Sequence, residues 1–178
     1  MLNRISNLDS LIEQLSNGSK EEYKAIGVTL DLPLSELLPY TFWSDKHYTR
    51  NCIDKTNDFE LILLCWEPGQ ETSVHCHGGE ECWVYMIDGE LEESHYKYEN
   101  DILEKVNTDK LLSGAKSFMS DEIGYHKLVN NTSNRAISLH LYMDPINTCT
   151  VYDENLKRFK PITLAYHSYK GSLETVGV

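Results

Sequence analysis

Short apolar runs separated by turn-forming residues recur from residue 41 onward, and this pattern constrains the fold most. The runs are rich in Ile, Leu, Val, Tyr and Trp, and Gly, Asn and Asp separate them. Such runs predict short strands, near residues 48–53, 59–66, 72–77, 81–88, 91–98, 116–119, 125–129, 136–143, 149–153 and 161–168. Gly78-Gly79 and Asp88-Gly89 are the clearest turn signals, and the second is typical of a tight hairpin. Many short strands favour a β-sandwich or barrel.

The first forty residues have a helical pattern instead. Leucine and isoleucine keep helical spacing over residues 8–15, and Asn17-Gly18 is a plausible stop. Ser19 and Glu22 resemble the capping box of a second helix. Pro33 and Pro39 bracket a short third turn. We therefore expect one mainly β domain over residues 1–178, with a helical cap over 1–40 and a barrel over 41–178.

Composition excludes several classes of function. The 178 residues suffice for one domain with its own core. A net charge of -12, from 16 Lys+Arg against 28 Asp+Glu, leaves no basic run to offset nucleic-acid phosphates or anionic membranes. The run over 61–66 is too short to span a bilayer, and residues 1–10 lack the apolar stretch of a signal peptide. Five cysteines without a CxxC pair predict reduced thiols and a cytoplasmic protein.

The most informative stretch lies between Gly69 and Gly89 and contains His75-Cys76-His77. Residues two apart on a strand face the same side, so the two imidazoles should lie together. Neutral imidazole is a common ligand of divalent transition metals. Taken alone, the pair could also be two hydrogen-bonded histidines at the edge of a loop. It is therefore a metal-site candidate that needs a further ligand.

The spacing around this pair resembles the first cupin motif. The second cupin motif brings one more histidine after a glycine, and Gly124-Tyr125-His126 fits that role. The resemblance therefore implies a cupin barrel of the jelly-roll or double-stranded β-helix type, with His75, His77 and His126 as metal ligands. Most cupins carry a glutamate ligand where this chain has Cys82. Glu81 is adjacent, but on a strand it would point to the opposite face.

If Cys82 is not a ligand, three neutral imidazoles leave the metal its full positive charge. An incoming substrate thiolate would then add anionic charge and favour reaction with O2. Three-histidine zinc sites also exist, so the ligands alone leave the metal open.

Several further motifs resemble the cysteine dioxygenases, most closely the eukaryotic type. The resemblance runs from about His47 to Lys170. Its motifs are Tyr48-Thr49-Arg50-Asn51, Cys65-Trp66, the three histidines, Ser138-Leu139-His140-Leu141-Tyr142 and Thr148-Cys149. It implies an iron(II) enzyme that uses O2 to oxidise L-cysteine to cysteine sulfinic acid, in cysteine catabolism toward taurine. It also implies a thioether cross-link between Cys82 and Tyr142, a protein-derived cofactor. We expect a monomer.

The polar residues make chemical sense beside this resemblance. Ser138, His140 and Tyr142 alternate with aliphatic residues, so one face of their strand is polar. We expect that face to point into the barrel, with Tyr142, His140 and Cys82 in catalytic positions and Ser138 in contact with substrate; a solvent-exposed strand face is the alternative. Arg50 is the candidate clamp for the substrate carboxylate, because its guanidinium can engage both oxygens.

Some roles have plainer alternatives. Arg50 could form an ordinary surface ion pair, and Cys82 could be a small buried apolar residue. Tyr48 could support the substrate carboxylate or only pack beside it. Trp66 is expected in the core.

One departure from the family leaves the substrate open. The family commonly has Ser-Pro-Pro after the tyrosine, whereas this chain has Met143-Asp144-Pro145. A cis peptide bond at this point is therefore not expected, and the pocket wall should differ. Rival functions are a dioxygenase of 3-mercaptopropionate or another small thiol, a non-redox metal-binding cupin, and a cupin that binds a thiol without consuming O2. Arg50 argues against 3-mercaptopropionate.

Overall fold

The computed structural model describes residues 4–174, which form three α-helices, a short 3-10 helix and twelve strands. The N-terminal helical cap is confirmed: α1 spans Leu8–Asn17, α2 Lys20–Thr29, α3 Leu34–Leu37, and the 3-10 helix η1 Leu38–Tyr40. The Asn7 side chain caps α1 by accepting the Ser10 N–H at 3.0 Å. At the start of α2, the Glu22 carboxylate accepts the Ser19 N–H at 2.7 Å, as the sequence predicted.

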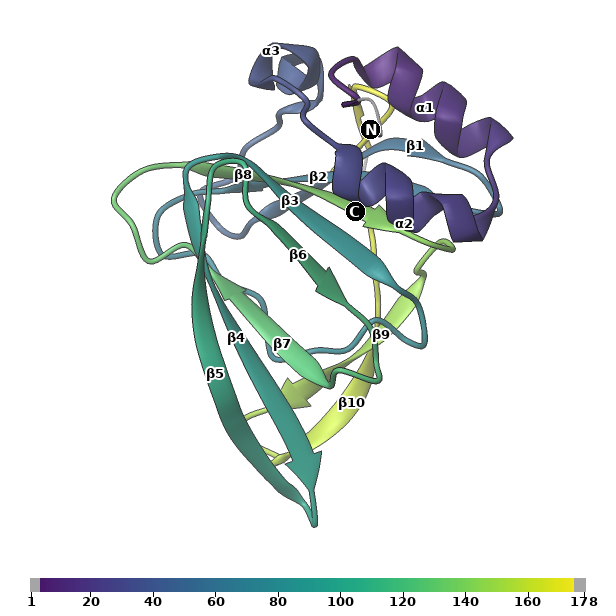
Figure 1. Ribbon diagram of the computed structural model, residues 1–178. Helices are drawn as coiled ribbons and strands as arrows, with labels where there is room; N and C mark the ends of the chain where they lie inside the picture. The colour runs from purple at the N-terminus through teal and green to yellow at the C-terminus, as the bar shows by residue number, and fades with distance from the viewer. Residues whose placement is uncertain (1–3, 175–178) are drawn as a thin grey trace.

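The strands make three sheets that close into a barrel (Figure 1). The first has seven strands in the order β12-β11-β1-β2-β8-β3-β6, the second has the order β5-β4-β7, and the third is the hairpin β10-β9. Their bounds are β1 Thr49–Lys55, β2 Glu60–Trp66, β3 Cys82–Asp88, β4 Glu90–Glu99, β5 Ile102–Leu112, β6 Lys116–Met119, β7 Tyr125–Val129, β8 Ala136–Tyr142, β9 Thr148–Asp153, β10 Arg158–Thr163, β11 Ser168–Tyr169 and β12 Ser172–Leu173. The mainly β, cupin-like barrel predicted from the sequence is confirmed.

The seven-stranded sheet has an apolar layer on each face. The side chains of Leu61 and Leu139 pack against the helical cap, together with Leu11 and Leu15 of α1. Alternate residues of the same strands, such as Ile62, face the barrel interior. Every residue of β2 and β8 is consequently buried. The polar face of β8 is therefore an interior face and not a solvent-exposed one.

Gly89 shows where the hairpin prediction was wrong. It joins β3 to β4, but those strands belong to different sheets and do not pair. Gly89 has φ 78°, and a Cβ there would lie 2.6 Å from the carbonyl oxygen of Arg135, so the corner needs glycine. A tight hairpin is found one strand later. It joins β4 to β5 through Asn100 and Asp101, which have φ 52° and 63°. Positive φ at both central residues is the requirement of a type I′ turn.

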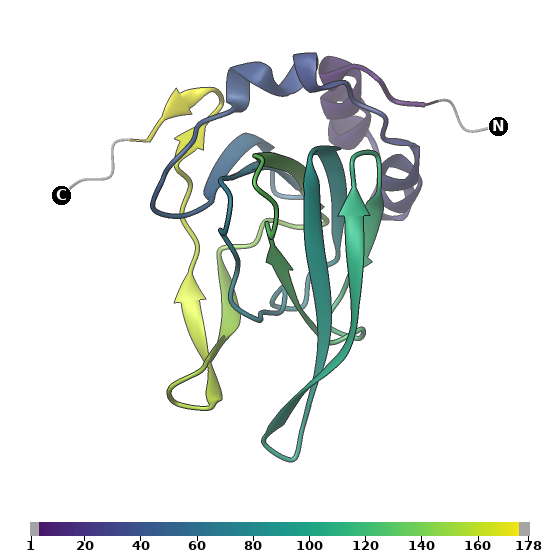
Figure 2. The same ribbon diagram turned by 90° about the vertical axis from the view of Figure 1, so that its left-hand side faces the viewer.

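Other boundaries also differ from the prediction. The segment 72–77 is not a regular strand. It lies between β7 and β9, but it meets them only through isolated bridges at His75 and a few single backbone hydrogen bonds. β5 was not predicted, and the stretch predicted over 161–168 divides into the end of β10 and the start of β11. Figure 2 shows the hairpin of β9 and β10 as the yellow-green pair, with the chain continuing upward from the end of β10 to β11.

Candidate metal centre and its pocket

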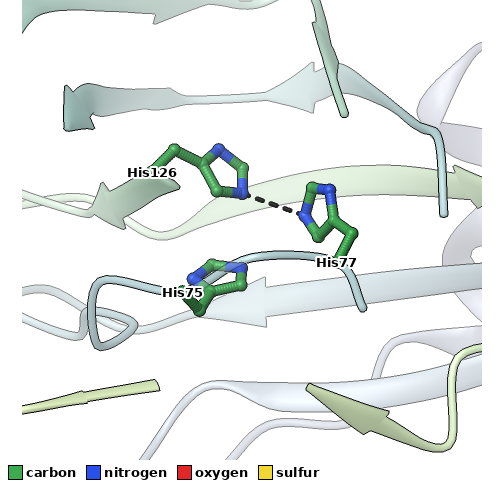
Figure 3. A group of neighbouring side chains, drawn as sticks. All are labelled: His75, His77 and His126. Carbon is green, nitrogen blue, oxygen red and sulfur yellow. Dashed lines mark hydrogen bonds between the residues drawn. The ribbon is translucent and has the colours of Figure 1, made fainter. Parts of the chain in front are cut away.

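Three histidines from two distant segments converge inside the barrel (Figure 3). His75 and His77 lie on the segment between β2 and β3, and His126 is the second residue of β7. One ring nitrogen from each lies within 4.8 Å of the others. The bridge between His75 and His126 brings the two segments together, since each backbone N–H donates to the other's carbonyl at 3.0 Å. The trio predicted as metal ligands is therefore assembled in space.

Hydrogen bonds orient two of the three rings so that Nε2 faces the others. His75 Nδ1 lies 2.9 Å from the Ser73 carbonyl oxygen, and His126 Nδ1 lies 2.6 Å from Glu93 Oε1. The Nε2 atoms of His126 and His77 are 3.0 Å apart. Two nitrogens at roughly 2.1 Å from one cation, at near right angles, would be about 3 Å apart. The donor set therefore fits a divalent transition metal.

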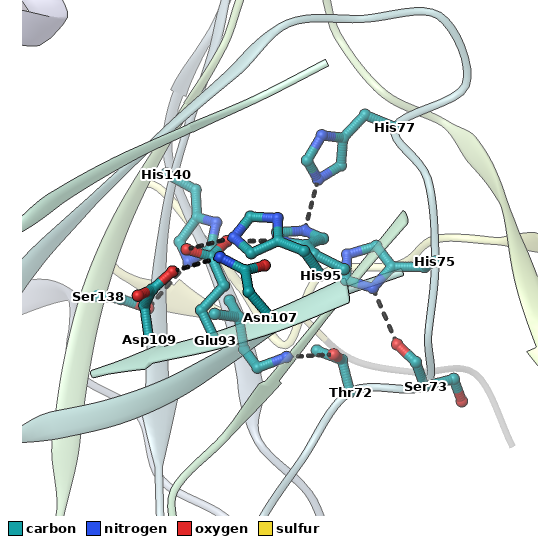
Figure 4. A network of polar contacts seen from close by, with 12 residues as sticks. Thr72, Ser73, His75, His77, Glu93, His95, Asn107, Asp109, Ser138 and His140 are labelled. Atoms are coloured by element: carbon teal, nitrogen blue, oxygen red, sulfur yellow. Dashed lines mark hydrogen bonds and ion pairs between the residues drawn. The ribbon is translucent and has the colours of Figure 1, made fainter. Parts of the chain in front are cut away.

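Glu93 is the carboxylate behind His126, and the sequence argument missed it. It is 1% exposed and lies on β4. Its other oxygen lies 3.6 Å from Nε2 of His95 (Figure 4). A carboxylate that accepts the second N–H of a ligating histidine fixes its ring and raises its basicity. Glu93 belongs to the acidic run Glu90-Leu91-Glu92-Glu93, a composition that predicts exposed side chains. Only the pairing of β4 with β7 reveals its role.

A small cavity with a volume of about 80 Å³ lies beside the histidines. One part of its lining is polar and the other is apolar. The lining residues are Tyr48, Arg50, Thr72, Ser73, His75, His77, Tyr142, Ile146, Cys149, Val151, Ile162 and Leu164. A cavity of this size suits a small molecule and not a macromolecule.

Arg50 brings a buried cation to this cavity. The residue is 8% exposed, and its Nε and Nη2 atoms have no hydrogen-bond partner among the described residues. Unpaired buried donors cost free energy, which an anionic ligand would recover. The backbone of Arg50 is held by His167, whose Nδ1 accepts the Arg50 N–H at 3.0 Å and whose N–H donates to the Arg50 carbonyl at 2.8 Å. Arg50 is thus fixed and available to bind an anion.

The polar residues of β8 divide into two groups. Tyr142 lines the cavity, next to the guanidinium of Arg50 and with its ring 5.5 Å from that of His77. His140 and Ser138 do not line it. Ser138 Oγ lies 2.9 Å from His140 Nε2 and accepts the Trp66 indole N–H at 3.0 Å. Trp66 in turn stacks on Tyr48, with ring centroids 4.6 Å apart. Ser138 therefore does not contact the cavity itself, and its hydrogen bonds hold His140 and Trp66.

Cys82 is the first residue of β3, and Glu81 directly before it points to the opposite side, as predicted. Cys82 is fully buried in the interior and is the Cα partner of Tyr142 across β3 and β8. Glu81 points outward and pairs with Lys24 of α2 at 2.9 Å. The Cys82 thiol is therefore close to the pocket while the neighbouring carboxylate is not.

Burial sets the protonation of the interior groups. Desolvation lowers the pKa of His77, His126 and His140 well below the usual histidine value, so these rings are neutral near pH 7. Desolvation likewise raises the pKa of the Tyr142 phenol well above its usual value, and the phenol stays protonated. Neutral imidazoles are the form that binds metal, and a protonated phenol can donate a hydrogen bond.

The turn after Tyr142 differs from a proline-rich one. Among residues 4–174 every peptide bond is trans, including those around Asp144. Asp144 has φ 141°, a backbone region that favours glycine, and it forms an ion pair with Lys20 of α2. Ile146, two residues after Asp144, lines the cavity, so this turn forms part of the pocket wall.

Two further findings concern the cysteines and the helices. All five cysteines are free and buried. Among the described residues no helix has both the length and the apolar character needed to cross a membrane.

Known proteins resemble this chain in sequence and in fold. The family described as cysteine dioxygenase type I matches residues 8–155. Cysteine dioxygenase type 1 of Homo sapiens is 30% identical over 176 residues, covering 94% of this chain and 88% of its own. The Rattus norvegicus protein of that name is 28% identical over the same coverage. The solved structure of TT1209 from Thermus thermophilus has a TM-score of 0.50 and 19% identity, covering 61% of this chain and 93% of that one, which is a likeness of fold alone.

Proposed function

The chain belongs to the cysteine dioxygenase type I family, and we propose that it oxidises L-cysteine to cysteine sulfinic acid with O2 at a non-haem iron(II) centre. One observation carries this proposal: the same small cavity is lined by two members of a histidine trio that could hold a metal and by a buried arginine with two unpaired donor atoms. L-Cysteine offers a thiolate and an amine to a metal and a carboxylate to an arginine. Both oxygen atoms of O2 end on sulfur, so R–SH and O2 give R–SO₂H.

His75, His77 and His126 would hold the iron. The orientation of His75 and His126 through Ser73 and Glu93 supports this assignment. Iron(II), when bound, supplies the redox chemistry that lets O2 react with a thiol. Because the three imidazoles are neutral, they would leave the positive charge of a bound iron(II) ion in place, and that charge would favour the thiolate form of the substrate.

Arg50 would hold the substrate carboxylate. Its free Nε and Nη2 atoms could donate to the two carboxylate oxygens, which is the strongest geometry available to a guanidinium. Tyr48 lines the same part of the cavity and would support the carboxylate with its hydroxyl. Burial raises the pKa of that phenol, so it would act as a donor.

Tyr142 and His140 would position substrate and oxygen by hydrogen bonds. Tyr142 would act directly, because it lines the cavity, whereas His140 would act from behind it, fixed by Ser138. Ser138 would therefore hold His140 and influence the substrate indirectly. A thioether between Cys82 and Tyr142 would tether the phenol at one position and stiffen this side of the pocket.

We propose that the enzyme works as a cytoplasmic monomer. The free thiols of all five cysteines are in keeping with a reducing compartment. L-Cysteine and O2 reach the cavity as small molecules and require no partner protein.

Product analysis tests the proposed function. The wild-type protein, loaded with iron(II), should convert L-cysteine to cysteine sulfinic acid in air, as measured by mass spectrometry. His126→Ala should lose most of its iron and nearly all turnover, whereas His47→Ala, a change at an exposed histidine, should keep both. A His126→Ala protein with full iron content and turnover would rule out this metal site. Cysteine binding without O2 consumption would assign the chain to a non-catalytic role.

A further inference from the structure

The apolar wall of the cavity combines strand residues with two loop residues. Val151 of β9 and Ile162 of β10 belong to it, and Ile146 and Leu164 add the part that lies outside the strands. Ile146 lies between β8 and β9, and Leu164 follows β10. Leu164 N–H donates to the Asn147 carbonyl at 2.9 Å, so the two loops are joined. Neither residue has a place in a regular sheet ladder that would fix its position. Other contacts must hold this part of the wall.

Glu60, the first residue of β2, holds one end of it. The side chain is fully buried, and Oε2 accepts the Ile146 backbone N–H at 3.1 Å. Its other oxygen, Oε1, lies 3.7 Å from Lys55 Nζ and has no hydrogen-bond partner among residues 4–174. A buried carboxylate with only one direct hydrogen bond is costly to the fold. A carboxylate at this position therefore does more than fill space in the core.

Lys55 holds the other end. It is the last residue of β1 and the Cα partner of Glu60 across the hairpin. Its ammonium group donates to Asn147 Oδ1 at 3.1 Å and to the Tyr166 hydroxyl at 3.0 Å. Asn147 and Tyr166 belong to the two loops that carry Ile146 and Leu164. Three interactions of one ammonium group thus link both loops to the Glu60 carboxylate.

We propose that Lys55 and Glu60 are positioning residues that set the apolar wall of the cavity, and thereby the length of thiol that fits beside the histidines. This inference rests on the proposed thiol oxidation. With the wall held inward by Glu60 and Lys55, Ile146 and Leu164 leave room for the single methylene of L-cysteine. Release of the wall enlarges the space and admits homocysteine, which has one methylene more.

The test compares the two thiols in iron-loaded variants. Lys55→Met keeps the aliphatic stem but removes all three interactions of the ammonium group. It should raise KM for L-cysteine by about three- to tenfold, the size of the net contribution of one ordinary hydrogen bond, with kcat changed less than twofold. The ratio of kcat/KM for homocysteine to that for L-cysteine should rise. Glu60→Gln keeps an acceptor for the Ile146 N–H and should have a smaller effect than Glu60→Ala.

Lys170→Met is the matched control. Lys170 also forms an ion pair at this edge of the sheet, with Asp54 at 2.7 Å, but it does not line the cavity. It should leave both KM values and the thiol preference unchanged. The double variant Lys55→Met/Glu60→Gln should shift KM by no more than the larger single effect, because the two residues act on one wall.

The outcomes separate the inference from the function on which it rests. A wild-type protein that oxidises neither thiol would contradict the proposed function itself. A wild-type protein that oxidises L-cysteine, with Lys55→Met and Glu60→Gln matching Lys170→Met in KM and thiol preference, would overturn the role of the pair alone. A purely structural role would lower kcat and the unfolding temperature without changing KM or preference, and that result would also overturn it. If Glu60→Ala fails to fold, the other two variants still decide.

Discussion

Cys82 and Tyr142 lie directly opposite each other on the neighbouring antiparallel strands β3 and β8, and both side chains face the barrel interior. Facing residues of such strands have Cβ atoms roughly 5 Å apart, and the phenol of Tyr142 is close enough to influence the pKa of the Cys82 thiol. The pair is therefore placed for a bond between the Cys82 sulfur and a carbon of the Tyr142 ring.

That bond predicts a measurable loss of mass. Forming it removes one hydrogen from sulfur and one from the ring, and O2 takes up the two electrons and two protons. Protein exposed to iron(II), L-cysteine and air should contain a fraction lighter by two hydrogens, with the two peptides joined after digestion and not separated by reductant. Cys82→Ala should lack the cross-link and turn over more slowly, whereas Cys149→Ala should retain it. Loss of iron from Cys82→Ala would instead make Cys82 a metal ligand.

The two unpaired donor atoms of the Arg50 guanidinium, Nε and Nη2, predict discrimination between thiols. Removing one partner of a buried ion pair costs about 2–5 kcal/mol, so Arg50→Ala should lower kcat/KM for L-cysteine by roughly 30-fold or more. Cysteamine lacks the carboxylate and should be affected little. Arg50→Lys should fall between, because an ammonium group cannot form the two parallel hydrogen bonds. Equal losses for both thiols would mean that Arg50 supports the fold and not the substrate.

The contact between Glu93 and His126 predicts an effect on metal affinity. Glu93→Gln should weaken cobalt(II) binding by about 10- to 100-fold, the usual consequence of losing a carboxylate behind a ligating histidine. Competition with a coloured chelator measures this without turnover. Glu92→Gln changes the neighbouring residue, which points to the other side of β4, and should bind cobalt(II) as the wild type does. An unchanged affinity in Glu93→Gln would show that the hydrogen bond orients nothing.

Burial of Glu60 predicts a pH dependence of stability. Desolvation raises the pKa of this carboxyl above its usual value of 4.5, so the folded protein binds the proton more tightly than the unfolded chain does. Stability from this residue is then present at low pH and falls as pH rises from 4.5 through the raised pKa. Urea unfolding should show that the free energy of unfolding of Glu60→Gln, relative to that of the wild type, increases as pH rises from 4.5 to 7. A gain of the same size in the exposed control Glu122→Gln would contradict this assignment.

The sequence predicted the residues whose roles depend on local spacing. His75 and His77 are two positions apart, and the spacing around His126 fits a known motif, so the trio required no knowledge of the fold. The inward orientation of β8 followed from its alternating polar residues. The capping box at Ser19 and Glu22 was likewise local, and the structure reproduces it.

The residues that the sequence missed depend on contacts between distant segments. β5 escaped because nearly all of its residues are exposed or charged and it lacks an apolar face. The turn at Asp88-Gly89 was predicted to form a hairpin, because a local turn signal cannot show to which sheet the next strand belongs. Glu93, Ile146 and Leu164 acquire their positions through β7, Glu60 and Asn147, and nothing in their immediate sequence marks them.

The central claim, that both atoms of O2 are transferred to the sulfur of L-cysteine, is tested most directly with isotopically labelled oxygen. The iron(II)-loaded protein should be supplied with L-cysteine under ¹⁸O₂ in ordinary water, and the product analysed by mass spectrometry. We predict cysteine sulfinic acid that carries two ¹⁸O atoms, with one O2 consumed for each product molecule. A product with one labelled oxygen or none, or O2 uptake without sulfinic acid, would contradict the account.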